Sequence, residues 1–310
     1  IPMSSGEPSR ALRPSEEEAL ARDYGAWLGG RRVREEIVRP WPARALAATL
    51  DRDPGDLVEG AWLPWGWHWL HFHHAVRASE LGRDGHEALG RFLPDVPLER
   101  RMWAGGRIRF HAPLVLGEPA RRVSTVHQIM PKRGRTGALV FVTVKHEIHG
   151  PDGLAVEEEQ DIVYRSPPER EGGSEGEDGA KSAPGWPEGT RPADTRVVGR
   201  FRADAVTLFR FSALTFNAHR IHYDHPYATA EEGYPGLVVH GPLLALLLLD
   251  AGAVLRSGDV RSFEYRARAP LFCDEDFELL AAPSDVSSDQ EVQLWAAHPE
   301  RGPAMEANLR

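Results

Sequence analysis

The chain has 310 residues, an apolar fraction of 41%, a charged fraction of 27% and a net charge of −9 at pH 7. This length suggests two domains of ordinary size or one large one, and the composition is that of a soluble protein with a substantial core. The acidic net charge excludes a general basic surface for nucleic acid. Cys273 is the only cysteine, which excludes a disulfide within the chain and argues against a cysteine-based metal site.

Two stretches bear on the location of the protein. Residues Ile1 to Arg13 have no apolar core of the signal-peptide type. The most apolar run, Leu237 to Leu255, is interrupted by His240, Pro242 and Asp250, so it predicts a buried helix and not a membrane span. We therefore expect a cytoplasmic protein with neither a membrane nor a nucleic acid as partner.

The first half of the chain predicts two helices followed by a sheet. Apolar residues at helical spacing indicate helices over Pro14–Leu28, with Ser15 as N-cap, and over Trp41–Leu50. Alternating or β-branched segments then predict four strands: Arg107–His111, Arg121–Met130, Ala138–His149 and Val156–Tyr164.

The segment Ser166 to Asp194 is crowded with Gly, Pro, Ser and Glu and has almost nothing to bury. Such a segment cannot offset the entropy cost of ordering, which is typical of a solvated linker. We therefore expect an N-terminal domain over residues 1–165, a linker over 166–194 and a C-terminal domain over 195–310.

The second half repeats the plan of the first. The predicted elements are a strand over Thr195–Phe201, a short helix over Ala203–Leu214 and the apolar helix from Gly241. Three strands follow, over Arg261–Arg268, Asp276–Ala282 and Glu291–Ala297. The apolar helix is hydrophobic nearly all round, so a sheet should wrap it. Each half of the chain thus has helices followed by a run of antiparallel strands, and this pattern predicts an α+β fold. The specific expectation is a double hotdog, in which two antiparallel sheets each wrap around a central helix.

The most informative stretch lies between Phe211 and Pro242 and contains FNAHRIHYD and YPGLVVHGP. It resembles the MaoC-like hydratases, and within them the type 2 hydroxyacyl-thioester dehydratases and the related itaconyl-CoA and mesaconyl-C4-CoA hydratases. WGWHWLHF, RRMWAGG, KRGRTGALVFVTVKHEI and EEQDIVYR in the first half support the same resemblance. It implies an acyl-CoA or acyl-ACP substrate, no cofactor, and an N-terminal domain that is not catalytic and shapes the acyl pocket.

The resemblance matches Asn217 and His222 to the acidic residue and the catalytic histidine of the family, five positions apart. A histidine suits proton transfer in both directions near neutral pH. We expect the Gly241 N–H, at the start of the apolar helix, to donate to the thioester oxygen. An amide cannot take a proton, so Asn217 should orient the water or the 3-hydroxyl group. Asp224 is a candidate to orient His222.

Three more residues are candidates for substrate binding. Arg220 is either an ion-pair partner within its loop or an anchor for a substrate carboxylate or a CoA phosphate. Tyr234 lines the acyl pocket or packs locally. His240 directly precedes Gly241 and is expected to contact the substrate.

The remaining histidines have structural interpretations. His219, His222 and His225 lie at three-residue intervals, but neither cysteines nor an HExxH-type spacing accompany them, so no metal is expected. The four histidines between His68 and His74 lie among tryptophans, which favours a structural aromatic cluster.

These residues predict an enzyme that reversibly adds water to, or removes it from, an acyl thioester. Two alternatives are a non-catalytic acyl-thioester binding or scaffold protein and a thioesterase. The sequence leaves open whether the acyl chain is a dicarboxylic unit, such as an itaconyl or mesaconyl group, or a plain fatty chain. A homodimer is compatible with this expectation.

Overall fold

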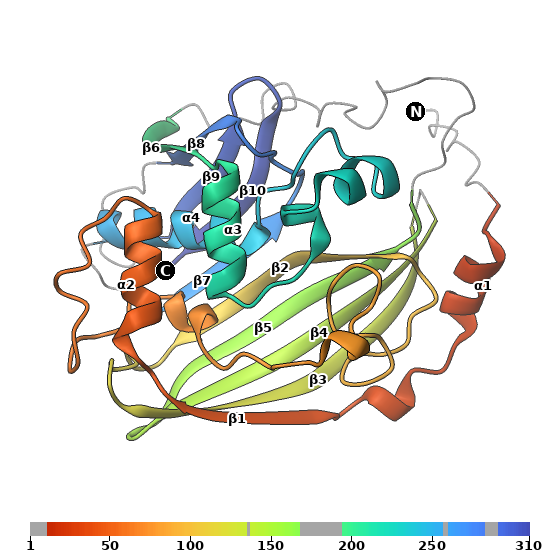
Figure 1. Ribbon diagram of the computed structural model, residues 1–310, viewed down its shortest axis with the longest axis horizontal. Coiled ribbons are helices and arrows are strands. Elements are labelled where there is room, and N and C mark those ends of the chain that lie inside the picture. Colours follow the sequence, from red (N-terminus) through yellow and green to blue (C-terminus); the bar gives the residue numbers. More distant parts are fainter. Residues whose placement is uncertain (1–10, 135–136, 168–193, 257–259, 283–290) are drawn as a thin grey trace, which may run out of the picture.

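The computed structural model describes residues 11–134, 137–167, 194–256, 260–282 and 291–310. Within these ranges ten strands form one continuous antiparallel sheet in the order β1-β3-β4-β5-β2-β7-β10-β9-β8-β6 (Figure 1). The N-terminal strands are β1 (Arg31–Ile37), β2 (Arg100–Phe110), β3 (Pro119–Gly134), β4 (Gly137–Gly150) and β5 (Gly153–Arg165). The C-terminal strands are β6 (Arg196–Arg202), β7 (Ser262–Ala267), β8 (Asp276–Ala281), β9 (Val292–His298) and β10 (Gly302–Leu309).

The sheet has a buried inner face and a solvated outer face. In β4, Val140, Val142 and Val144 are buried, whereas Phe141, Lys145 and Glu147, at the alternate positions, are partly exposed. This alternation is what an antiparallel sheet needs when only one face covers a core. The β-branched composition of β4 therefore explains both its extended conformation and its orientation.

Helix α4 (Gly241–Leu255) packs across the C-terminal strands β7 to β10. Every residue from Leu243 to Leu249 is buried, as expected for a helix enclosed by a sheet. The contact with the sheet is close: a Cβ added to Gly252 would lie 2.5 Å from Leu309 Cδ2. The predicted enclosure of the apolar helix is confirmed.

The N-terminal half departs from the predicted detail in two ways. Its strands are not a separate sheet, because β2 pairs with β7 and joins both halves edge to edge. The fully described stretch from Val38 to Glu99 contains α2 (Pro40–Thr49) and 3-10 turns but no helix as long as α4. In Figure 1, α2 stands beside α3 (Ala205–Leu214) on one side of the molecule.

The first helix is shorter than predicted. Helix α1 covers Pro14–Ala21, and a separate 3-10 turn covers Gly25–Trp27. Its N-cap is Arg13, whose N–H donates to the Glu16 carboxylate at 2.8 Å, so Ser15 lies inside the helix and does not cap it. Proline fits the first helical position because its missing N–H would have no partner there.

The segment of tryptophans and histidines contributes to a core that both halves of the chain share. The Trp69, Trp103 and Tyr265 rings meet edge to face, with centroids 5.1 to 6.0 Å apart. The buried Glu158 accepts from the Trp69 Nε1–H at 2.9 Å and contacts His68 Nε2 at 3.0 Å. The predicted aromatic cluster is present, and the carboxylate that completes it was not predicted.

Most of the predicted linker, residues 168–193, lies outside the described residues, so the division into domains stays a prediction. None of the helices in the described ranges is long and apolar enough to cross a membrane.

Candidate active site

A loop between α3 and α4 carries the predicted catalytic residues. Helix α3 begins at a cap in which Asp204 accepts the Thr207 N–H, and beyond its end at Leu214 the chain passes through a left-handed Phe216, with φ of 48°. A large residue adopts this conformation at a cost on the order of 1 kcal/mol or more, and such positions gather at functional sites. The change of chain direction at Phe216 lets the Asn217 N–H donate to Ser212 O at 2.9 Å, and this hydrogen bond fixes the start of the loop.

The imidazole of His222 is buried and held in one tautomer. Its Nδ1 lies 2.7 Å from the Val238 carbonyl oxygen, which only accepts, so Nδ1 carries the proton and Nε2 keeps its lone pair. Burial lowers the pKa of His222 to about 4, against the smaller opposing effect of the Val238 carbonyl. His222 is therefore a neutral base at physiological pH.

Asp224 does not orient His222, contrary to the possibility raised from the sequence. Its Oδ2 accepts from Arg220 Nε and Nη2 at 2.9 and 2.7 Å, and its Oδ1 accepts the Tyr227 N–H. The carboxylate is satisfied by its own loop, and a backbone carbonyl does the orienting instead.

Asn217 presents donors to the site. Its Oδ1 accepts the His219 N–H at 3.0 Å, which fixes the side chain in a local turn. No described contact uses its amide nitrogen. The amide group can therefore donate to an oxygen atom of a ligand, whereas its acceptor is already engaged.

His240 lies beneath His222 and is fully buried. The two rings stack with centroids 3.7 Å apart and planes 20° apart, and His240 Nε2 contacts Ser212 Oγ at 2.8 Å. Burial lowers the pKa of His240 well below its ordinary value. His240 therefore packs against His222, and its expected contact with the substrate stays a prediction.

Gly241 begins α4 directly after this stack, and no described contact provides an acceptor for its N–H. A Cβ added to Gly241 would lie 3.1 Å from Cε3 of Trp103, so the indole ring closes one side of the helix start. The Trp103 Nε1 is buried without a partner. A glycine N–H at a helix start is a suitable donor to a developing oxyanion.

Arg220 and Tyr234 take part in local contacts. Arg220 pairs with Asp224, donates to Arg83 O and stacks over the Tyr227 ring, 4.2 Å from its centroid. Tyr234 packs against Phe272 in a small apolar cluster. Of the two interpretations of Arg220, the structure contains the ion pair.

The N-terminal half also reaches this loop, through residues 82–87. The Arg220 N–H donates to Asp84 O at 2.9 Å. Gly85, with φ of +91°, lies so close that an added Cβ would meet Ala218 O at 1.9 Å, so only glycine fits. Arg101 from β2 holds the Asp84 carboxylate through Nε and Nη2 at 2.6 and 3.1 Å.

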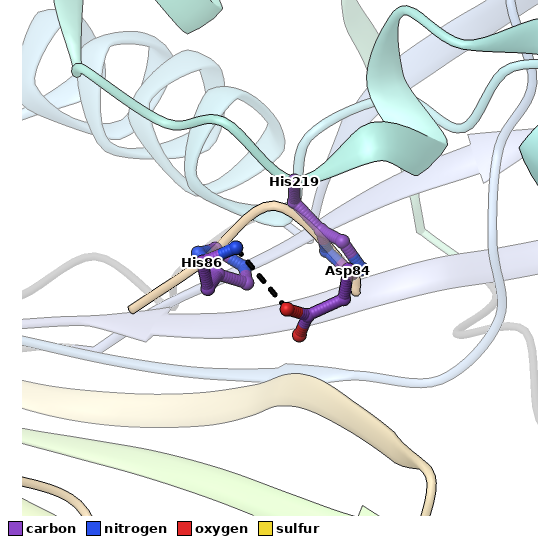
Figure 2. Close-up of side chains that lie close together, drawn as sticks. All are labelled: Asp84, His86 and His219. Carbon is purple, nitrogen blue, oxygen red and sulfur yellow. Dashed lines mark hydrogen bonds between the residues drawn. The ribbon is translucent and has the colours of Figure 1, made fainter. Parts of the chain in front are cut away.

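Asp84, His86 and His219 meet at one place (Figure 2), and the His219 ring lies beside that of His222. Each offers a ligand atom within 4.8 Å of the others, and the His86 and His219 ring centroids lie 4.6 Å apart. These residue types suit a divalent metal, but the Arg101 guanidinium already neutralises Asp84, which opposes a cation there. Asp84 and His86 were not predicted, because the turn-rich segment GRDGHEALG carries no periodic or motif signal.

A cavity of about 310 Å³ adjoins this cluster. Residues from both halves of the chain line it, among them Asp84, Arg101, Tyr164, Tyr227 and Glu232. Tyr164 is fully buried, and burial raises the pKa of its hydroxyl to about 12. The site thus lies next to a space between the two halves.

Comparison with known proteins identifies the family of this chain. Residues 66–273 match the family model for hydroxyacyl-thioester dehydratase type 2. The chain is 45% identical over 271 residues to a mesaconyl-C(4)-CoA hydratase from Chloroflexus aurantiacus, covering 87% of this chain and 93% of that protein. It is 28% identical to the mitochondrial type 2 hydroxyacyl-thioester dehydratase of Schizosaccharomyces pombe, covering 69% of this chain and 76% of that one.

Solved structures share the fold. A MaoC-like dehydratase superposes with a TM-score of 0.65 at 15% identity, covering 92% of this chain and 98% of that chain. A Mycobacterium tuberculosis protein described as a double hotdog has a TM-score of 0.56 at 13% identity, covering 91% and 95%. The predicted double hotdog is confirmed. The extent of the family match and the 45% identity together show that this chain belongs to the type 2 hydroxyacyl-thioester dehydratase family.

Proposed function

We propose that this protein reversibly hydrates a 2-enoyl-CoA whose β-carbon carries a carboxylate, as in the C4 thioester of mesaconate. As a member of its family the protein is a hydro-lyase that acts on acyl thioesters. The 45% identity to a mesaconyl-C(4)-CoA hydratase, over 93% of that protein, supports the dicarboxylic substrate and CoA as the carrier. The observation that carries the chemistry is the neutral His222 with an unprotonated Nε2.

The reaction needs a base, a proton for C2 and a donor to the thioester oxygen. In the hydration direction, His222 Nε2 takes a proton from water while the water oxygen bonds to C3. The electron pair of the C2–C3 double bond moves towards C2 and the thioester oxygen, where the Gly241 N–H stabilises the charge. The imidazolium then returns a proton to C2, so the sum of the two steps is the addition of one water molecule.

Asn217 and His240 assist His222 in this scheme. The free amide N–H groups of Asn217 donate to the oxygen of the water or of the 3-hydroxyl group and so point it at Nε2. His240 packs under the imidazole of His222 and is itself fixed by Ser212, which limits rotation of the base. Of the six residues predicted from the sequence, we assign catalysis to His222, Asn217 and Gly241 and support to His240.

Mass spectrometry after incubation with mesaconyl-C4-CoA and with crotonyl-CoA tests this function. The expected product is heavier by one water, and His222→Ala should lower the rate by roughly 100-fold or more, since positioned proton transfer contributes about 10²- to 10⁴-fold. His225→Ala, at an exposed position of the same loop, is the matched control and should keep the wild-type rate.

Three outcomes would contradict the proposal. Binding of both thioesters without any hydration would favour a binding or scaffold protein. Release of free CoA thiol would indicate a thioesterase. Normal hydration by His222→Ala would place the base elsewhere.

A further inference from the structure

We propose that His86 and His219 form the subsite that binds the substrate carboxylate next to the reacting carbon. This inference rests on the proposed function, and it assigns the N-terminal half a direct part in substrate selection. Figure 2 shows His86 and Asp84 on a segment of that half, lying against His219 of the catalytic loop.

The two imidazoles have unused hydrogen-bonding capacity. No described contact engages a ring nitrogen of His86 or His219, and both residues are partly exposed. His219 lies beside the base, since the His219 and His222 ring centroids are 5.5 Å apart, and the His86 ring centroid lies 4.6 Å from that of His219. Two adjacent side chains with free ring nitrogens can each donate one hydrogen bond to the two oxygens of a carboxylate.

The position of the carboxylate in the proposed substrate requires an anion-binding site next to His222. In the C4 thioester of mesaconate, the second carboxylate and a methyl group are attached to C3, the carbon to which water adds. The carboxylate is therefore one bond from the atom that His222 serves, and its subsite must adjoin His222. A carboxylate on C3 also repels an incoming hydroxide-like nucleophile, so donors that hold its charge favour the attack.

The surrounding charges are arranged for an anion. Arg101 pairs with Asp84, which removes the negative charge that would otherwise repel a carboxylate. Burial lowers the pKa of both His86 and His219, with Arg101 contributing at His86. Both rings are thus neutral in the free enzyme, and a bound carboxylate would favour protonation of the pair.

A matched pair of unreactive ligands isolates this subsite. Methylsuccinyl-C4-CoA carries the carboxylate, and isovaleryl-CoA has a methyl group in its place. Calorimetric titration should show that His86→Phe raises the Kd for methylsuccinyl-C4-CoA by about tenfold or more. This is the loss of affinity expected when one charge-assisted hydrogen bond is removed. Isovaleryl-CoA should bind wild type and variant with nearly equal affinity, and His86→Gln should restore part of the loss because it keeps a donor.

His127→Phe, at an exposed position of β3, serves as the control for a histidine-to-phenylalanine change. Equal losses for both ligands, or no loss for either, would overturn the subsite. A stoichiometric divalent metal in the purified protein, with ligand binding abolished by a chelator, would overturn it in favour of a cation site. The outcome for the proposed function is separate, because it depends on whether the wild type hydrates mesaconyl-C4-CoA.

Discussion

The role of Asn217 is open to direct test, because the local turn uses its oxygen and leaves its nitrogen to the site. Asn217→Asp should keep turnover: one carboxylate oxygen can accept the His219 N–H while the other accepts a hydrogen bond from the water, which orients the water in place of the amide donor. Asn217→Leu should lower kcat by roughly 10- to 100-fold, because it removes both the turn and the donor. Steady-state hydration rates decide this, and wild-type kcat in Asn217→Leu would remove the residue from the mechanism.

The pH dependence of kcat/KM reports on His222 in the free enzyme. Its pKa is lowered to about 4 by burial, so the neutral base is present above that pH and is lost as pH falls through it. Activity should therefore stay near its neutral-pH value down to about pH 5 and decline around pH 4. Circular dichroism at each pH separates this decline from unfolding. An acid limb at pH 6 to 7 in the folded enzyme would show that His222 is not desolvated.

At the residue scale, the sequence predicted groups within one motif and missed those that meet through folding. His222, Asn217 and Gly241 lie within 25 positions, and their spacing carried the prediction. His86 lies more than 130 positions before His222 and joins it only because residues 82–87 fold onto the catalytic loop. No local pattern encodes such a contact. The orienting role of the Val238 carbonyl was equally hidden, since any residue provides a carbonyl.

At the scale of helices and strands, the prediction is correct where the residue composition of a segment matches its burial in the sheet. Strands β3, β4 and β5 are rich in β-branched residues and were predicted. Two strands were missed for different reasons. β1 (RRVREEI) lies at an edge of the sheet, where charged residues such as Glu35, paired with Arg121, are tolerated on exposed positions. β10 (GPAMEANL) has low strand propensity and forms because it is buried between β7 and β9.

The β2–β7 junction is sensitive to the size of one residue. A Cβ added to Gly105 in β2 would lie 2.4 Å from the backbone oxygen of Tyr265 in β7, which cannot move without breaking the strand pair. Gly105→Ala should therefore lower the free energy of unfolding by about 1–3 kcal/mol. Gly236→Ala is the matched control, since an added Cβ there meets nothing within 4 Å. Denaturant titration measures both, and equal stabilities would contradict the close approach.

At the scale of the molecule, both halves contribute to one core. A single cluster of buried residues includes Leu46 and Ile108 from the first half and Leu246 and Phe263 from the second. The joint between them is tight, because a Cβ on Gly66 would lie 2.6 Å from Leu249 Cδ2. The predicted domains 1–165 and 195–310 therefore meet through an apolar interior and a shared sheet. The homodimer and the cytoplasmic location stay predictions.

This shared core predicts how the chain behaves when it is cut between its halves. A protease site introduced within residues 174–180 of the predicted linker should allow complete cleavage, yet the fragments should elute together from a sizing column and keep hydratase activity. The β2–β7 hydrogen bonds and the buried apolar contacts hold them, and separating the halves would expose that surface to water. For the same reason, each half expressed alone should aggregate. Fragments that separate in native buffer, each with its own cooperative thermal transition, would instead show two independently folding domains whose contact contributes little to stability.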